Sequence, residues 1–68
     1  MKPSIGRIVH FTDVAEHTCA AIVTGVIGDT NQVNLAIFNR VELTFDSLVP
    51  YSELPAVGCW SWPPRTGP

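Results

Sequence analysis

Two tryptophans near the end of this 68-residue chain are the side chains best suited to hold a planar ligand. Trp60 and Trp62 are two positions apart, so in a β-strand both rings project from one face. Such a pair either fills the end of a small barrel or a subunit interface, or lets a ring stack on a nucleobase. Stacking contributes about 1–3 kcal/mol per base, and it is the functional hypothesis for both residues.

Arg7 and His10 lie near the N-terminus and would take opposite faces of a regular strand. The planar guanidinium of Arg7 is suited to a phosphate or carboxylate, which it binds through two parallel hydrogen bonds. Its alternative is a surface ion pair, which adds little stability. His10 precedes a polar loop, where a histidine is either a hydrogen-bonded structural residue or a ligand contact. Both residues are included among the candidate ligand contacts.

Tyr51 and Asn34 complete the candidate set. Tyr51 follows a proline at a predicted corner, where its hydroxyl either hydrogen-bonds a ligand or caps the core and faces water. Asn34 lies on the polar side of an otherwise apolar strand, where its amide either reads a base edge or pairs across the strand. The predicted ligand-binding residues are Arg7, His10, Asn34, Tyr51, Trp60 and Trp62.

Catalytic and metal chemistry have little support in this sequence. It has no Gly-x-Ser-x-Gly motif and no glycine-rich phosphate loop. His17 and Cys19 would share a strand face, but no third group orients them as a base and a nucleophile. The two cysteines and two histidines lack the spacing of zinc ligands. We therefore predict a non-enzymatic protein without a cofactor, catalytic residues or a metal site.

The cysteines fit best as small core residues. A disulfide between Cys19 and Cys59 would require their strands to be adjacent and the compartment to be oxidising. Two cysteines are also too few to hold together a disulfide-stapled miniature protein.

Composition limits the chain to one small domain that needs an additional source of stability. Hydrophobic residues make up 46% of the sequence and charged residues 15%, which is typical of a folded chain rather than a disordered one. A domain of this size buries only about 60% of the surface that its unfolded chain exposes. We expect homo-oligomerisation to provide the additional stability.

Charge and hydropathy narrow the range of partners. The net charge is −2, and the only cationic side chains are Lys2, Arg7, Arg40 and Arg65. Nucleic-acid binding is not expected, because it needs a concentrated basic face. A small anion needs only two or three converging cations, and copies of the chain in an oligomer multiply them.

No membrane contact is expected either. The longest apolar stretch, residues 19–27, has about nine residues, against the ~20 that a membrane-spanning helix needs. The first eleven residues lack the apolar run of a signal peptide. The expected location is cytoplasmic, where cysteines stay reduced.

The alternation of apolar residues is typical of β-strands throughout. Five strands are predicted, over residues 5–11, 19–27, 33–38, 41–46 and 58–62. The first places Val9 and Phe11 on one face and Ile8 and His10 on the other. The second is almost entirely apolar or small, which predicts a central strand covered on both sides. The fourth alternates cleanly, as a half-buried strand does.

The connections carry turn signals. Residues 12–18 indicate a polar loop, residues 28–31 and 39–40 tight turns, and residues 50–55 a corner with a single helical turn. We predict an all-β fold, a small five-stranded SH3-like partly open barrel assembled into a homo-oligomer, with a five-stranded OB-like barrel as the alternative. Residues 1–63 would form the domain and residues 64–68 a flexible tail.

Five segments of the chain carry a resemblance to a known family. They are GRIVHF at 6–11, CAAIVT at 19–24, VNLAIF at 33–38, LVPY at 48–51 and GCWSWP at 58–63. The chain resembles a family of small bacteriophage and prophage proteins, which implies a location in the host bacterial cytosol. It departs from the family pattern at Asn39-Arg40, where related sequences carry a longer polar hairpin. In size it is also similar to phage "sponge" proteins, oligomers that sequester host immune nucleotide signals, although no motif supports that analogy.

These observations lead to a functional hypothesis with two alternatives. The leading hypothesis is a non-enzymatic phage protein that sequesters a small nucleotide-like anion in pockets of a homo-oligomer, with the rings holding the base and Arg7, and in some arrangements Arg40, neutralising phosphate. One alternative is a virion or assembly module in which the tryptophans form a protein–protein hot spot. The other, disfavoured by the acidic balance, is an SH3-like module that binds RNA or DNA.

Overall fold

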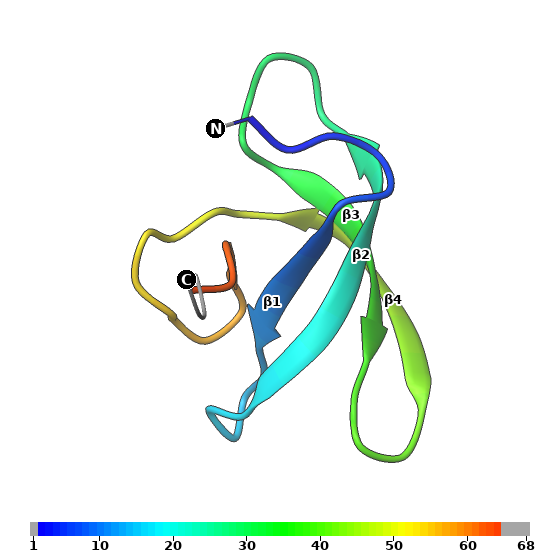
Figure 1. Ribbon diagram of the computed structural model, residues 1–68, viewed down its shortest axis with the longest axis vertical. Coiled ribbons are helices and arrows are strands. Elements are labelled where there is room, and N and C mark those ends of the chain that lie inside the picture. The colour runs from blue at the N-terminus through cyan, green and yellow to red at the C-terminus, as the bar shows by residue number, and fades with distance from the viewer. Residues whose placement is uncertain (1, 65–68) are drawn as a thin grey trace, which may run out of the picture.

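The computed structural model describes residues 2–64, which form one antiparallel sheet of five strands without a helix (Figure 1). The order across the sheet is β4-β3-β2-β1-β5. The predicted tail falls mostly on residues 65–68, which lie outside the described part of the chain. The strands are β1 (Ile8–Thr12), β2 (Thr18–Val26), β3 (Val33–Phe38), β4 (Leu43–Val49) and β5 (Trp60–Ser61).

Three connections join β1 to β4 as consecutive hairpins. The predicted polar loop forms the first connection, and the predicted turn residues lie in the other two. In the β2–β3 connection Gly28 has a φ of 55°, a conformation that glycine adopts without a steric penalty. In the β3–β4 connection the Asn39 side-chain oxygen accepts hydrogen bonds from the backbone N–H groups of Val41 and Glu42. The β1–β2 and β3–β4 turns consequently lie at the same end of the sheet (Figure 1).

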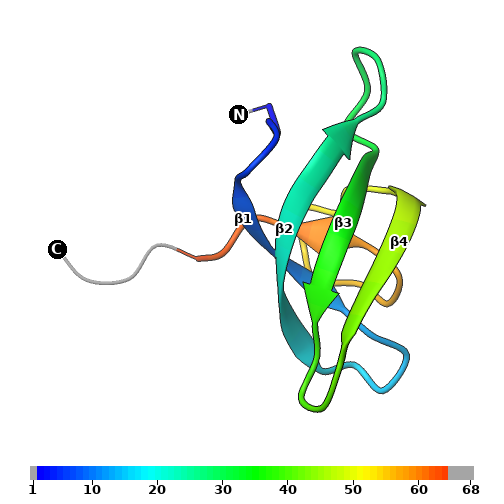
Figure 2. The ribbon, with the colours of Figure 1, turned by 90° about the vertical axis from the view of Figure 1, so that its right-hand side faces the viewer.

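The sheet curls so that its two ends approach each other, which fits a partly open barrel (Figure 2). β5 pairs with β1, and Trp60 also forms a parallel bridge to Tyr51, just after β4. The Trp60 N–H donates to the Pro50 carbonyl, and the Ser52 N–H donates to the Trp60 carbonyl, each at 2.9 Å. The predicted helical turn over residues 50–55 is wrong, because this segment uses its backbone to pair with β5.

The core lies on the inner, concave face of the curled sheet. Val9 and Phe11 point inward while Ile8 and His10 point away from the core, as the alternation in β1 predicts. Trp60 is fully buried and is the largest side chain of this core. The buried cluster comprises Val9, Phe11, Cys19, Ala21, Val23, Val33, Leu35, Ile37, Val49 and Trp60.

Two predictions about the covered faces are wrong. β2 is central in the sheet, but it is covered on one face only, since Ala20 and Thr24 are exposed. In β4 the alternation is present, yet its large apolar side chains, Leu43 and Phe45, face solvent, and Thr44 faces the core side opposite Ile37. Alternation separates the two faces of a strand without stating which of them the fold buries.

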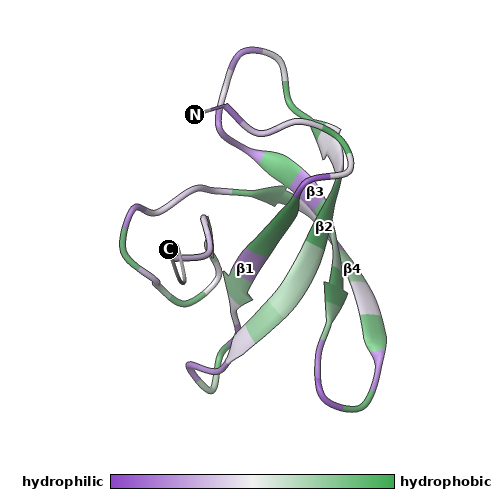
Figure 3. Ribbon diagram, viewed as in Figure 1, coloured by the Kyte–Doolittle hydropathy of each residue, from purple (hydrophilic) through white to green (hydrophobic). Residues whose placement is uncertain are grey.

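Apolar residues make up much of β1 to β4 (Figure 3). Those that point away from the core form the convex side of these strands, here called the outer face, which is therefore largely apolar. Strand register arranges it in two rows that run across the four strands. The first row consists of Ile8, Ile22, Ala36 and Phe45. The second row consists of His10, Ala20, Phe38 and Leu43.

Candidate functional site

Four of the six predicted ligand-binding residues meet where β5 joins the barrel. The ring centroids of Tyr51 and Trp60 are 4.8 Å apart, and those of Trp60 and Trp62 are 5.1 Å apart with nearly perpendicular planes. The guanidinium carbon of Arg7 lies 5.3 Å from the Trp62 ring centroid. These four residues are called the aromatic cluster. The shared face predicted for the two tryptophans is consistent with their ring contact.

Trp60 is the structural centre of the aromatic cluster. Its side chain is 0% exposed, and its indole N–H donates a 2.7 Å hydrogen bond to the Asn31 carbonyl. In this structure the protein covers the Trp60 ring completely, and the predicted contact of this residue with a ligand stays a prediction. The edge-to-face contact of Trp60 fixes the half-buried ring of Trp62.

Arg7 and Trp62 hold each other by a cation–π contact at the surface of the cluster. Strand pairing positions them, because the Arg7 carbonyl accepts a hydrogen bond from the Val23 N–H at 2.9 Å and β5 pairs with β1. A guanidinium has all of its N–H donors in the plane of its fork, and this is the edge through which it binds a phosphate or carboxylate. Tyr51 is half-buried and packs against Trp60, with the two ring planes tilted by 56°.

His10 and Asn34 do not belong to the aromatic cluster. His10 is on the outer face of β1, opposite Ala20 on one side and Ser61 on the other. Asn34 is in β3, and its side-chain oxygen accepts a 3.1 Å hydrogen bond from the Leu48 N–H. Both residues therefore stay apart from the four that the fold brings together.

The Asn34 contact supports an irregularity in β4. The β3–β4 register shifts between Leu35 and Val33, and Leu48 lies in this shift with a φ of 55°, a left-handed conformation that is costly for leucine. The Asn34 amide therefore bonds the backbone of a residue inside the register shift. This is the cross-strand role that the sequence left as the alternative to reading a base edge.

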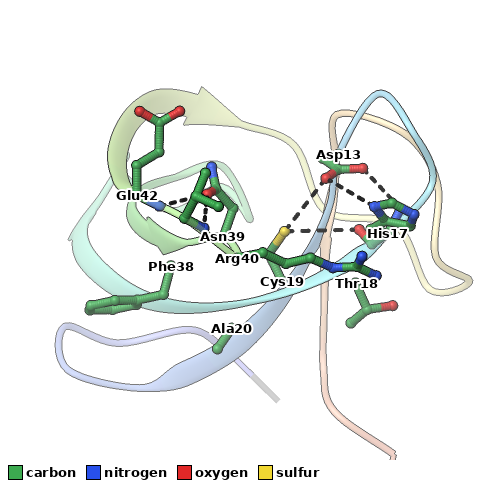
Figure 4. A pocket seen from close by; sticks show the side chains of 10 residues that line it. Asp13, His17, Thr18, Cys19, Ala20, Phe38, Asn39, Arg40 and Glu42 are labelled. Carbon is green, nitrogen blue, oxygen red and sulfur yellow. Dashed lines mark hydrogen bonds and ion pairs between the residues drawn. The ribbon is translucent and has the colours of Figure 1, made fainter.

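A second candidate site, missed at the sequence level, lies between the two hairpin tips at one end of the sheet. This hairpin-tip pocket has a volume of about 460 Å³ (Figure 4). Its polar side chains come from the β1–β2 turn and the β3–β4 turn. They include Asp13, His17, Asn39, Arg40 and Glu42. In an antiparallel meander the first and third turns lie at the same end of the sheet. The predicted order of the strands therefore contains the information needed to place these two turns together.

Asp13 organises the β1–β2 side of the pocket. One of its carboxylate oxygens accepts hydrogen bonds from the backbone N–H groups of Ala15 at 3.0 Å and His17 at 2.8 Å. The other lies 4.0 Å from the His17 imidazole. These interactions, led by the His17 N–H bond, hold the pKa of Asp13 below its usual value. The carboxylate is thus committed mainly to shaping its own turn.

Cys19 lies behind Asp13 and keeps its proton. Its thiol is 3.8 Å from an Asp13 carboxylate oxygen, and burial, followed by the nearby negative charge, raises its pKa. Such a thiol is a poor nucleophile, and the His17 side chain is directed to Asp13 rather than to Cys19 (Figure 4). Cys19 and Cys59 are both free thiols.

Arg40 brings positive charge to the same pocket from the β3–β4 turn (Figure 4). The positive charge of Arg40 lowers the pKa of the Cys19 thiol, whereas the negative charge of Asp13 raises it. Arg7 precedes β1, whereas Arg40 lies at the end of the sheet beyond Thr12 and Thr18. The two arginines are therefore at opposite ends of one chain, so one ligand meets both only if two chains supply them.

Among residues 2–64, no three His, Cys, Asp or Glu side chains lie close enough together to hold a metal ion. The same residues contain no helix with the length and hydrophobicity of a membrane crossing.

Compared with protein-family models, with curated proteins and with solved structures, the chain matches none of them. The phage-protein family to which the sequence points therefore stays an expectation.

Proposed function

We propose that this chain is a non-enzymatic phage binding module that sequesters a small, planar, nucleotide-like anion in the host cytosol. The observation that carries the proposal is the contact between Arg7 and Trp62, a guanidinium 5.3 Å from the centroid of a half-buried indole. It joins the two chemistries that such a ligand needs, a ring for the base and donors for the phosphate.

The rest of the aromatic cluster supports this role by restricting movement of Trp62. A ring fixed against a fully buried neighbour loses little conformational freedom when a ligand stacks on it. Tyr51 contacts the same buried ring, so its hydroxyl is a further candidate contact. Because Trp62 is half-buried rather than enclosed, we propose that a second copy completes the pocket.

The strand order supports an SH3-like barrel as the scaffold. The order β4-β3-β2-β1-β5 leaves the short last strand beside the first. The backbone bonds between β5 and residues 50–52 draw the two ends of the sheet together. We propose this barrel, as a homo-oligomer, in preference to an OB-like barrel.

Isothermal titration calorimetry against a panel of mononucleotides, cyclic dinucleotides and ADP-ribose-type compounds tests the proposal. We expect micromolar or tighter binding of at least one of them. Arg7→Ala and Trp62→Ala should each weaken that binding about tenfold or more. Lys2→Ala removes the same charge from a residue outside the aromatic cluster and is the matched control. An absence of binding across the whole panel overturns the proposal.

A protein-docking module in a virion or assembly intermediate is the second candidate. It is favoured by the β4–β5 connection, where Leu54 and Val57 are exposed on a loop that is not part of the outer face. Copurification with phage particles, lost on Leu54→Ser and Val57→Ser substitution, would support it. A chain found only free of particles would contradict it.

A further inference from the structure

The two cross-strand rows of the outer face bring four large, exposed apolar side chains together on β1, β3 and β4. Its most exposed large members are Phe45 at 73%, Ile8 at 63%, Leu43 at 48% and Phe38 at 45%. If each such side chain has about 200 Å² of surface, these four alone present roughly 450 Å². Soluble monomers seldom leave more than a few hundred Å² of contiguous apolar surface exposed.

The charge of the outer face favours an identical partner. Its two rows contain no Lys, Arg, Asp or Glu, although the chain as a whole has a net charge of −2. Charged residues lie at its margins, including Arg7 before β1 and Arg40 and Glu42 in the β3–β4 turn. Two copies of a neutral apolar face meet without repulsion between like charges, as a two-fold symmetric interface requires.

The area of the face also suits a second copy. A standard protein interface buries about 800 Å² on each partner, and the four large side chains supply more than half of that. The remaining exposed area of Ala20 and the half-buried Ile22, together with the margins of the face, adds to it. Face-to-face packing of two sheets would give the uncovered side of β2 and β3 the second layer that apolar sheet faces normally have.

We infer that the outer face is a self-association surface on which a second copy of this chain packs sheet against sheet. The inference deepens the homo-oligomer part of the proposed function and does not depend on any ligand. Ala20 and Phe38 belong both to the outer face and to the lining of the hairpin-tip pocket. A second copy on the outer face therefore borders that pocket, which one chain leaves open.

Sedimentation velocity over a range of concentrations tests the inference without a ligand. At micromolar concentration, the mass obtained for the wild-type chain should be twice that of the 7.4 kDa monomer. Phe45→Glu should weaken association at least tenfold, because it removes the most exposed aromatic ring of the face and introduces like charges into a symmetric interface. Leu54→Glu is the matched control, since Leu54 is 75% exposed but lies in the β4–β5 connection. It should leave the mass unchanged.

Carbene footprinting of the wild-type chain keeps the inference testable if Phe45→Glu does not fold. Labelling of Phe38 and Phe45 should fall as the protein is concentrated, while labelling of Leu54 stays constant. A wild-type chain that remains monomeric overturns the inference and leaves the face to a different protein. Unchanged labelling of Phe45 in an assembled wild-type chain, or loss of assembly in Leu54→Glu rather than Phe45→Glu, also overturns it. Since the readouts are mass and labelling, failure here is distinct from failure to bind nucleotides.

Discussion

Trp62 has two different neighbours, the buried ring of Trp60 and the guanidinium of Arg7. The first fixes its orientation, and the second gives its surface a positive charge. The two tryptophans could be selected as candidate contacts from the sequence, because they carry large rings and lie beside two prolines that restrict the backbone. The sequence could not predict that Trp60 is buried and Trp62 partly exposed, since a two-residue spacing does not tell which of two tryptophans the core buries.

The strained turn of Leu48 predicts a pair of opposite stability effects. Leu48→Asn should raise the free energy of unfolding by about 1 kcal/mol, because asparagine tolerates a left-handed backbone that is costly for leucine. Asn34→Ala should lower it by about 1 kcal/mol, because the Leu48 N–H loses its acceptor. Urea denaturation measures both. A loss of stability in Leu48→Asn would contradict the account of this irregularity.

The Asp13 turn predicts a pH dependence. Because folding holds the pKa of Asp13 below its usual value, its contribution to stability is present above the ordinary carboxyl pKa of about 4. It is lost as the pH falls through the lower pKa of the folded chain. Thermal melts of Asp13→Asn should therefore show a smaller drop in Tm between neutral and acid pH than those of the wild type.

Asp13→Ala serves as the control for this pH dependence. Unlike asparagine, alanine removes the acceptor for the Ala15 and His17 N–H groups, so it should lower the Tm at neutral pH further than Asp13→Asn does. If wild type and Asp13→Asn lose the same Tm on acidification, Asp13 is not the group responsible.

At the level of elements, the strands and hairpins could be predicted because alternation and turn residues are local signals. The connection after β4 could not, since residues 50–52 pair with β5, about ten positions further along the chain. Which face of β4 is exposed could not be predicted from its local sequence either. Leu43 and Phe45 would be expected inside by hydropathy, yet strand register places them opposite Phe38 and Ala36 on the outer face. The hairpin-tip pocket likewise depends on two turns that only the folded sheet brings together.

β5 predicts the largest single effect on stability. It has only two residues, and Trp60 provides its burial, an indole bond to Asn31 and the bridge to Tyr51. Trp60→Phe should lower the free energy of unfolding by about 2 kcal/mol, since it removes volume and a hydrogen bond from a fully buried position. Trp62→Phe, at a half-buried position, should cost about 1 kcal/mol or less. Equal effects in urea denaturation would contradict the central role given to Trp60.

For the whole molecule, small size and exposed apolar surface both favour self-association. A chain of 68 residues forms one curled sheet with a core on its inner face and apolar rows on its outer face. Length and composition predict assembly of several copies, which stays a prediction. The surface proposed for this assembly could be located only from the register of four strands.

Ionic strength should separate the two proposed interactions. Nucleotide binding at Arg7 should weaken as salt rises, because screening reduces the attraction between exposed charges. Self-association through the outer face should not weaken, because its two rows carry no charged residue. Calorimetry and sedimentation at low and high salt measure these responses. Assembly that dissociates with increasing salt would contradict the apolar interface.

The most direct test of the proposed site follows the indole N–H signals of the two tryptophans by NMR during titration with the nucleotide panel. A binding nucleotide should shift the Trp62 indole and Arg7 side-chain signals strongly. The Trp60 indole should shift little, because it is buried and donates to the Asn31 carbonyl. Signals that stay unchanged with every nucleotide, or shifts confined to His17 and Arg40 in the hairpin-tip pocket, would contradict the assignment of the site to Arg7 and Trp62.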